Sequence, residues 1–374
     1  MEDNMNIGVI NESGKIENRA GLTPSSVSTL TNRGHEVYIQ AGAGLKAGYS
    51  NEEYSNCGGK IVFTKDEVFG RSEVVLNISP LNDEECEFIK DDQILFGFHH
   101  LAVAKKSTLE GLLNKKATII GYEIVQKDDE KLPFIESLSE IAGQMCLVIS
   151  GHYLQSNYGG RGVIIGGVVS VPPATAVIVG SGILAKSAIK ALLGAGAHTI
   201  ALGRDMERLR EIEDMTSGRA VTLIASRYNL ERMIQIADIL IGAVLLPGEK
   251  APTVITREMV KKMRKGSVII DLSIDQGGCI ETSRLTTLEQ PTYIEDGIIH
   301  YCVPNITSAV SRTSTKVLSN LVTTYLLKIG DWGVDEALKK DPALSRGTYV
   351  YHGKLVRRSI AERFGLEYSE SFQS

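Results

Sequence analysis

The chain has 374 residues, a charged fraction of 23% and a formal net charge of −5 at pH 7. This length allows two domains with a core each, and the mild acidity gives no basic surface for nucleic acid. Apolar runs break at glycines and charges before they reach the length of a membrane span, and the polar first residues predict no secretion signal. Five scattered cysteines without metal-ligand spacing favour a reducing compartment. We therefore expect a cytoplasmic α/β enzyme without a metal site and without a nucleic-acid or membrane partner.

Short apolar runs alternate with helical segments over the first third of the chain. The alternation predicts a parallel sheet covered by helices. Strands are predicted at residues 5–10, 36–40, 60–62, 74–78, 93–98 and 117–121. Helices are predicted at 25–33, with Thr23 as the N-cap before Pro24, and at 106–114. The loop at 11–19 is long and polar, so it suits a small polar substrate better than a pyrophosphate.

Two adjacent histidines, His99 and His100, follow the strand at 93–98. Ligands of open parallel sheets bind beyond the carboxyl ends of the strands, which makes this pair a candidate for the active site. Neighbouring residues of a strand point to opposite faces, so we expect His99 to be structural. Tyr122-Glu123 follows the next strand in the same way.

A long helix is predicted from Leu138 towards Gln155 as a bridge between the two halves of the chain. A flexible, glycine-rich connection follows it at 159–167. Beyond the middle of the chain, the βα alternation resumes. Strands are predicted there at 176–179, 199–202, 221–223, 238–242, 267–272 and 299–303, and helices at 183–193, 229–237, 257–264 and 313–327. The last of these helices would return the chain to its first domain.

The turn Gly180-Ser181-Gly182 lies between the strand at 176–179 and the helix at 183–193. Strand, glycine turn, helix and strand in this order form the βαβ unit that binds a dinucleotide. Gly180 allows the tight turn, and Gly182 lets backbone N–H groups approach a pyrophosphate. A plain tight turn is the alternative.

The second strand of that unit ends without the acidic residue that usually binds the adenosine ribose. Gly203-Arg204 stands there instead. Glycine removes a carboxylate that would repel a 2′-phosphate, and arginine can bind such a phosphate through two hydrogen bonds. This favours NADP(H) over NAD(H). The alternative is a solvated Arg204, with Asp205 reaching the ribose.

Motifs along nearly the whole chain resemble the alanine dehydrogenase family, which is related to the NAD(P) transhydrogenase α subunit. They are Asn32–Val37, Gln40–Gly44, Gly159–Gly162, Ile241–Gly248, Ile274–Gly278 and Arg312–Thr315. The resemblance implies an α/β fold of two Rossmann-like, doubly wound parallel-sheet domains with the active site in the cleft between them. It also implies a discontinuous substrate domain at 1–138 and 306–374, a dinucleotide-binding domain at 139–305, and a homo-oligomer, either a hexamer or a dimer.

The resemblance assigns roles to individual residues as well. Arg19 falls on the arginine that holds the substrate carboxylate, His100 on the general acid/base, and Asp275 on an aspartate beside the nicotinamide and the substrate. Each could instead be structural, as a surface arginine, a packed histidine or a turn residue. Together with the glycine turn, the resemblance places the cofactor against Ser139, Gly180, Ser181, Gly182, Ile183, Gly203, Arg204, Val244, Leu245 and Asn305.

Three positions depart from the family pattern. Asn77 stands where the family has a lysine that contacts the substrate carbonyl, and a neutral amide can donate a hydrogen bond but supplies no cation. Gly203-Arg204 replaces the aspartate on the ribose, and Asn305-Ile306-Thr307 replaces Asn-Met-Pro near the nicotinamide.

These departures predict a specialised relative. We expect an NADP(H)-dependent oxidoreductase that acts on an amino, imino or 2-oxo acid and reduces a C=N or C=O bond beside its carboxylate. Asn77 would donate a hydrogen bond to the substrate in place of the lysine. The alternatives are an ordinary NAD-dependent alanine dehydrogenase and a non-catalytic nucleotide-binding module of the transhydrogenase kind.

Overall fold

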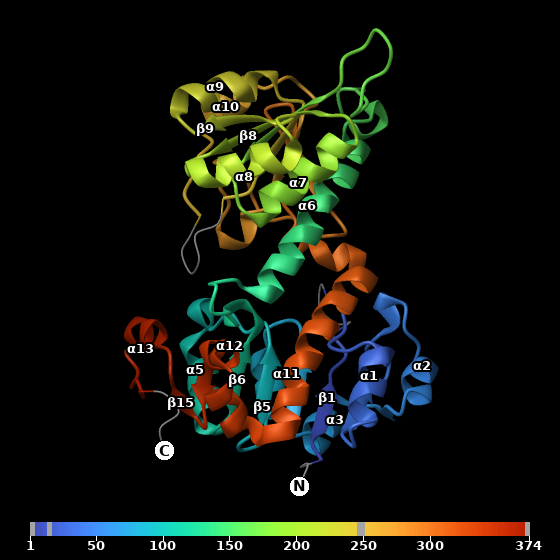
Figure 1. Cartoon of the computed structure of the whole chain (residues 1–374), viewed down its shortest axis with the longest axis vertical. Helices are drawn as coiled ribbons and strands as arrows, with labels where there is room; N and C mark the ends of the chain where they lie inside the picture. The colour runs from blue at the N-terminus through green and yellow to red at the C-terminus, as the bar shows by residue number, and fades with distance from the viewer. Residues whose placement is uncertain (1–3, 13–16, 245–250, 371–374) are drawn as a thin grey trace. The chain divides into compact units, whose positions relative to one another are not determined.

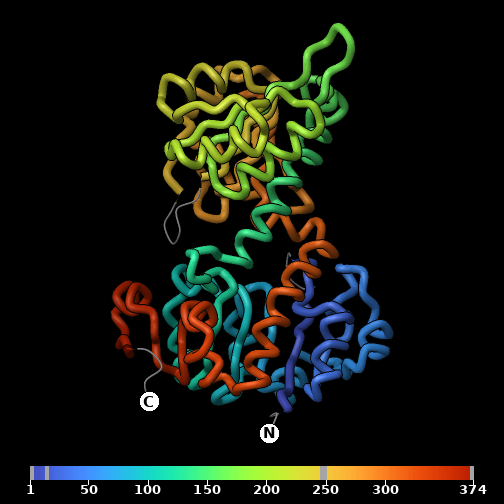
Figure 2. The backbone as a smooth tube through the Cα atoms, in the orientation of Figure 1, coloured from blue at the N-terminus to red at the C-terminus, as the bar shows by residue number. Residues whose placement is uncertain are grey.

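The computed structural model describes residues 4–12, 17–244 and 251–370, and it divides into two compact units. Unit 1 combines Met1–Ser137 with Ser308–Ser374, and unit 2 is the continuous segment Leu138–Thr307. The first strands, in blue, and the C-terminal helices, in orange and red, lie within the same unit (Figures 1 and 2). No helix within these described ranges is long and apolar enough to cross a membrane.

Unit 1 is built on a sheet that has eight strands among the described residues, in the order β15-β14-β6-β5-β4-β1-β2-β3. Strands β1 to β6 are parallel, whereas β14 pairs antiparallel with β6 and β15 antiparallel with β14. The order reverses between β1 and β4, so the sheet is doubly wound. The strands are β1 Asn6–Val9, β2 Glu36–Gln40, β3 Lys60–Val62, β4 Val74–Asn77, β5 Ile94–Gly97, β6 Thr118–Gly121, β14 Thr348–Tyr351 and β15 Lys354–Leu355.

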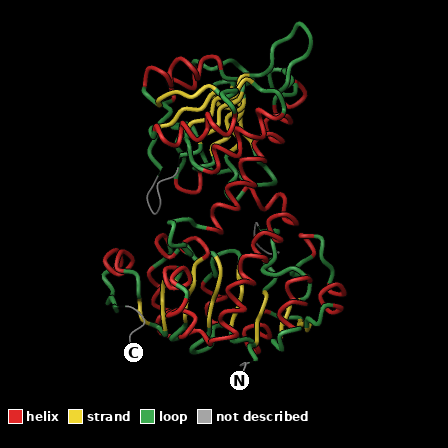
Figure 3. The backbone as a smooth tube through the Cα atoms, viewed as in Figure 1, coloured by secondary structure: helices red, strands yellow, loops and turns green. Residues whose placement is uncertain are grey.

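Helices flank this sheet, as the red and yellow segments of Figure 3 show. The helix at the first βα connection begins at the predicted cap Thr23, whose side chain accepts a hydrogen bond from the Ser26 N–H. The N–H of Thr23 donates to Ser319 Oγ at 2.8 Å, which fixes α1 against α11. The helices of unit 1 are α1 Pro24–Thr31, α2 Asn51–Asn56, α3 Lys65–Arg71, α4 Asp83–Glu87, α5 Lys106–Asn114, α11 Ser311–Lys340, α12 Pro342–Arg346 and α13 Arg358–Phe364.

Unit 2 repeats the arrangement with a sheet that has seven strands in the part of the chain that the structure describes. Its order is β12-β13-β11-β10-β7-β8-β9, with a reversal between β7 and β10 and one antiparallel strand, β12, at the edge. The strands are β7 Thr175–Val179, β8 His198–Gly203, β9 Val221–Ile224, β10 Ile239–Gly242, β11 Val268–Asp271, β12 Thr292–Glu295 and β13 Ile298–Tyr301. The helices are α7 Ile183–Gly194, α8 Met206–Thr216, α9 Arg227–Ile236 and α10 Arg257–Lys261. The predicted fold class of two doubly wound sheets is therefore confirmed.

Some elements differ from the prediction. Helix α6, Pro133–Tyr153, begins at Pro133 rather than at Leu138, because proline suits the first turn of a helix and Phe134 enters the core. Helix α11 passes the predicted end at residue 327 and continues to Lys340, with Gly333 at φ +72° inside it. Strands β14 and β15 are not predicted, because their runs of four and two residues are too short to show a pattern.

An aromatic cluster joins α6 to the sheet of unit 1. Phe134 stacks on Tyr122 with the ring centroids 4.3 Å apart, and it contacts Phe96 and Tyr325 at centroid distances of 6.2 and 6.0 Å. Phe96, Tyr122 and Phe134 are fully buried. Since such rings bury a large apolar area, the cluster holds the first turn of α6 against β5 and α11.

Replacement of Phe134 by alanine removes the centre of this cluster. We expect the free energy of unfolding of unit 1 to fall by about 3–5 kcal/mol, because a cavity remains among rings that cannot collapse into it. Trp332, the single tryptophan of the chain, lies on α11 and reports urea unfolding by its fluorescence. Phe63→Ala is the control, since the Phe63 side chain is 78% exposed. Equal urea midpoints for the two variants would contradict the role of the cluster.

Candidate functional site

The turn between β7 and α7 has the backbone geometry that a pyrophosphate site requires. Gly180 has a φ of +137°, and a Cβ atom there would lie 2.2 Å from the carbonyl oxygen of Ala243. Only glycine fits at this position. Gly182 is the N-cap of α7, and a Cβ atom there would meet nothing within 4 Å, so the space in front of the helix is open.

The N-terminus of α7 also keeps its hydrogen-bond donors available. No side chain of the described residues caps it, whereas Asp205 caps α8 and Ser226 caps α9. The first backbone N–H groups, from Ile183 onward, and the positive end of the helix dipole therefore suit an anion. Ser181 lies buried in the turn. The residues of this turn fit the pyrophosphate of a dinucleotide.

The end of β8 carries the residues that predict the cofactor type. Gly203 is the last residue of the strand, and Arg204 is exposed and makes no hydrogen bond or ion pair with any residue the structure describes. The carboxylate of Asp205 accepts hydrogen bonds from Glu207 N at 2.9 Å and Arg208 N at 3.2 Å. Asp205 is thus engaged as a helix cap, which weighs against the alternative in which it binds the ribose.

A buried aspartate that the sequence did not single out holds the loop after β11. Asp271 is fully buried and accepts hydrogen bonds from the N–H groups of Ser273 and Cys279, both at 3.0 Å, and of Ile280 at 3.2 Å. Burial raises the pKa of Asp271 above its usual value, although these hydrogen bonds oppose the rise. The predicted Asp275 lies exposed on this loop, in the turn Ile274–Gln276.

The other predicted cofactor residues are spread over unit 2. The N–H of Val244 donates to Ser273 Oγ at 3.0 Å, which joins the loops after β10 and β11. Leu245 lies outside the described residues. Ser139 is half-buried on α6, and Asn305 has a φ of +52° and accepts a hydrogen bond from Thr307 at 3.1 Å. The cofactor roles of Ser139 and Asn305 stay predictions.

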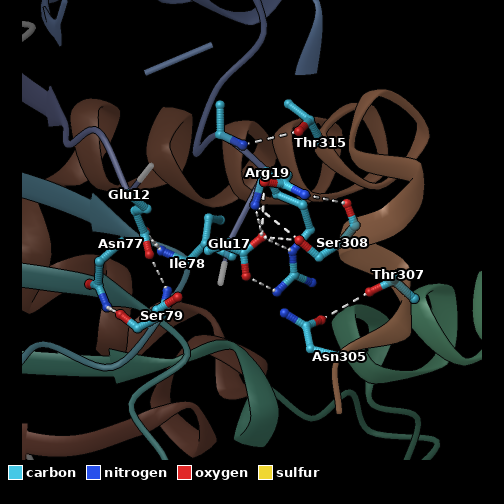
Figure 4. Close-up of polar contacts among 12 residues, drawn as sticks. Glu12, Glu17, Arg19, Asn77, Ile78, Ser79, Asn305, Thr307, Ser308 and Thr315 are labelled. Carbon is cyan, nitrogen blue, oxygen red and sulfur yellow. Dashed lines mark hydrogen bonds and ion pairs between the residues drawn. The ribbon is translucent and has the colours of Figure 1, made fainter. Parts of the chain in front are cut away.

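In unit 1, Arg19 is buried and forms a two-point ion pair with Glu17 (Figure 4). Arg19 Nε lies 2.7 Å from Glu17 Oε1, and Nη2 lies 2.7 Å from Oε2. Ser308 Oγ also donates to Glu17 Oε1, at 3.1 Å. Burial would raise the pKa of Glu17, but the charge and hydrogen bonds of Arg19 lower it overall. Arg19 is therefore not a surface arginine, and its guanidinium is oriented by a carboxylate that the sequence did not reveal.

Asn77 ends β4 next to a second buried carboxylate, that of Glu12. The Asn77 side-chain N–H donates to the Ser79 carbonyl at 2.9 Å, and Glu12 accepts hydrogen bonds from the N–H groups of Ile78 and, at 2.7 Å, Ser79 (Figure 4). Gly97 of the neighbouring strand is required, because a Cβ atom there would lie 1.9 Å from the Asn77 carbonyl oxygen. One donor of Asn77 is thus used within its own loop, and its contact with a substrate stays a prediction.

The two histidines after β5 have different environments. His99 is buried, and burial lowers its pKa to about 3, so this ring stays neutral. The His100 side chain is half-exposed, and its ring stacks on Phe98 with centroids 5.8 Å apart and an interplanar angle of 13°. The Arg19 guanidinium lies 5.8 Å from the centroid of the same Phe98 ring. Phe98 therefore brings Arg19 and His100 together.

A cavity of about 390 Å³ lies beside His100, between the loops that follow β4 and β5. His99, Pro80, Leu101 and Lys105 are among its lining residues. In unit 1, Arg19, Asn77 and His100 lie at or after the carboxyl ends of β1, β4 and β5. In unit 2, the glycine turn, Arg204 and Asp275 follow β7, β8 and β11. Glu12 could not be found from the sequence, because its carboxylate binds N–H groups 66 and 67 residues further along the chain. Glu17 and Asp271 were missed although each has partners within ten residues, because no known local motif marks such a carboxylate.

Substitution of Gly180 by alanine should abolish tight nucleotide binding. The new methyl group would overlap the Ala243 carbonyl and would need a φ that alanine rarely adopts, so the turn must shift. We expect the Kd for NADPH, measured by quenching of protein fluorescence or by calorimetry, to rise at least about 100-fold. Gly194→Ala, at the far end of α7 where a Cβ meets nothing within 4 Å, should bind as the unaltered protein does. An unchanged Kd in Gly180→Ala would rule out the turn as the pyrophosphate site.

Comparison with known proteins agrees with this arrangement. Family models described as the N-terminal and C-terminal domains of alanine dehydrogenase/PNT match residues 8–142 and 146–358. The chain is 42% identical to an alanine dehydrogenase of Methanococcus maripaludis over 366 residues, 98% of each chain. It is 39% identical to an alanine dehydrogenase of Halomonas elongata, over 98% of this chain and 99% of that one.

Two solved structures share the fold. An L-alanine dehydrogenase superposes with a TM-score of 0.92 at 37% identity, over 96% of this chain and 99% of that chain. A transhydrogenase from Sinorhizobium meliloti superposes with a TM-score of 0.82 at 18% identity, over 94% and 100%, and shows a likeness of fold alone. The expected class of oxidoreductase is confirmed by the family match, and the chain belongs to the alanine dehydrogenase/PNT family.

Proposed function

We propose that the chain transfers a hydride between NADP(H) and an amino, imino or 2-oxo acid, at the carbon beside the carboxylate. The observation that carries the cofactor half of the proposal is the end of β8, where Gly203 supplies no carboxylate and Arg204 extends into solvent. An unpaired guanidinium is suited to a 2′-phosphate, and Gly203 contributes no carboxylate that would repel it.

The substrate half of the proposal rests on Arg19, His100 and Phe98. Glu17 fixes the Arg19 guanidinium before any substrate arrives, so little freedom is lost when a carboxylate binds. Phe98 contacts both Arg19 and His100. Of the two adjacent histidines, His99 is buried and His100 is accessible. The His100 ring can therefore carry the proton that moves to or from the substrate nitrogen or oxygen.

The cofactor, when bound, supplies or accepts the hydride. The N-terminus of α7 would bind its pyrophosphate, and Arg204 would bind its 2′-phosphate. Gly203 carries no carboxylate, so nothing at this position would repel that phosphate. Asp275 would stabilise a cationic iminium or amine, and it is exposed on a loop held by Asp271, as this role requires.

A second candidate function is that of an ordinary NAD-dependent alanine dehydrogenase. It is favoured by the relatives named alanine dehydrogenase, which are 42% and 39% identical along nearly the whole chain. The two functions differ at two positions, Asn77 and Arg204. The third candidate is a non-catalytic nucleotide-binding module, in which His100 would have no role.

We also expect a homo-oligomer, a hexamer or a dimer, in the cytoplasm. Light scattering tests the oligomeric state, and cell fractionation tests the location.

Removal of the Arg204 side chain tests the cofactor preference. We expect Arg204→Ala to lower kcat/KM for NADPH about 10–100-fold and to leave that for NADH within a factor of about two, since one charge-assisted contact is lost. Gly203→Asp should shift preference further towards NADH. The assay combines NADPH or NADH with pyruvate and ammonia and with a cyclic imino acid. Arg210→Ala, exposed on α8, is the matched control. NADH preference in the unaltered protein with pyruvate and ammonia would favour the second candidate instead.

Removal of the His100 ring separates the enzyme from the binding module. We expect His100→Ala to lower kcat at least about 100-fold with every substrate of that panel, because the proton carrier is gone. The Kd for NADPH should not change, since the glycine turn belongs to unit 2. His198→Ala, an exposed histidine at the start of β8, should behave as the unaltered protein. Full turnover in His100→Ala would remove His100 from the mechanism.

A further inference from the structure

The carboxylate of Glu123 accepts hydrogen bonds from residues that follow β5 and from a residue of β14. Its Oε1 accepts hydrogen bonds from His99 N at 3.2 Å, from His100 N at 2.5 Å and from the Tyr349 hydroxyl at 3.0 Å. The Nδ1 atom of His100 lies 3.8 Å from the same oxygen. The Glu123 side chain is 10% exposed, so the carboxylate is largely shielded from water.

The sheet topology brings these groups together. Glu123 follows β6, the histidines follow the parallel neighbour β5, and Tyr349 lies on β14, the antiparallel neighbour of β6. Gly121 allows the Tyr349 ring to cross β6, because a Cβ atom there would lie 2.5 Å from its Cε2 atom. Burial raises the pKa of Tyr349, so its hydroxyl stays protonated and donates to Glu123.

The backbone of His100 is held in an unusual state. His100 has φ +47° and ψ +40°, in the left-handed region, which is unfavourable for a residue with a side chain. In this state the N–H groups of His99 and His100 both point to one oxygen of Glu123. Charge-assisted hydrogen bonds of this kind are stronger than neutral ones, and they offset the cost of the left-handed state.

We propose that Glu123, supported by Tyr349, is the positioning residue of His100. The proposal rests on the acid/base role of His100 given above. Glu123 fixes the backbone of His100 and faces its Nδ1 atom, while Phe98 stacks on the ring, so the Nε2 atom is left to exchange a proton with the substrate. When Nε2 holds that proton, the imidazolium charge lies next to the Glu123 carboxylate, with Nδ1 3.8 Å from Oε1.

Three variants test this proposal. We expect Glu123→Ala to lower kcat about 10–100-fold while KM for the carboxylate substrate changes less than about threefold, because Arg19 is untouched. Glu123→Gln keeps an oxygen that accepts the two N–H groups and should recover part of the loss. Tyr349→Phe should lose less than Glu123→Ala. The control is Tyr351→Phe on the same strand, whose hydroxyl donates to Asp335 at 2.9 Å away from this cluster.

A double variant distinguishes positioning from general damage. Since Glu123 acts through His100, Glu123→Ala should cause no further loss of kcat in the His100→Ala background. An additive loss, or a rise in KM without a fall in kcat, would overturn the proposal. Amide hydrogen exchange at His99 and His100 can be measured without turnover. In Glu123→Ala the exchange rate of these two amides should rise at least about tenfold. An unchanged rate would also overturn the proposal. Full activity in His100→Ala would contradict the acid/base role of His100 in the proposed function, and not only the positioning role of Glu123.

Discussion

Buried carboxylates that accept backbone N–H groups organise the carboxyl ends of both sheets. Parallel strands end at one edge, and the loops that leave them carry N–H groups that no strand or helix can satisfy. Glu12 binds two of these groups after β4, Glu17 binds two in the loop after β1, Glu123 binds two after β5, and Asp271 binds three after β11. A buried charge without such partners would be strongly destabilising, so each carboxylate and its loop require one another.

Each of these carboxylates stands beside one predicted site residue. Glu17 orients Arg19, Glu12 shapes the loop that Asn77 begins, Glu123 holds His100, and Asp271 holds the loop of Asp275. The site residues lie on irregular segments, where neither helix nor strand geometry fixes a side chain. A buried carboxylate provides the missing rigidity, because it accepts the backbone N–H groups of such a segment.

Features that depend on residues close together in the sequence could be predicted from it. The apolar run of β7, the turn at Gly180 and the cap at Thr23 depend on residues adjacent in sequence, so their chemistry is visible in a short segment. The alternation of side chains along a strand predicts a structural His99, and His99 is buried in the structure. However, β5 stops at Gly97, one residue before the predicted end, and His100 turns into the left-handed region. Contacts such as that of Glu123 with Tyr349 join segments more than 200 residues apart, as do the pairing of β14 and the return of α11. No short-range pattern encodes them.

The pairing of β14 with β6 has a consequence for synthesis on the ribosome. Unit 2 is one continuous stretch and can complete its sheet as soon as it emerges, whereas unit 1 must wait for Ser308–Ser374. Until then β6 is a bare edge strand, with backbone groups open to pairing with another chain. During synthesis there is therefore a period in which strands β1 to β6 can form a sheet while the edge of β6 is still unpaired. Pairing with β14 then covers this edge.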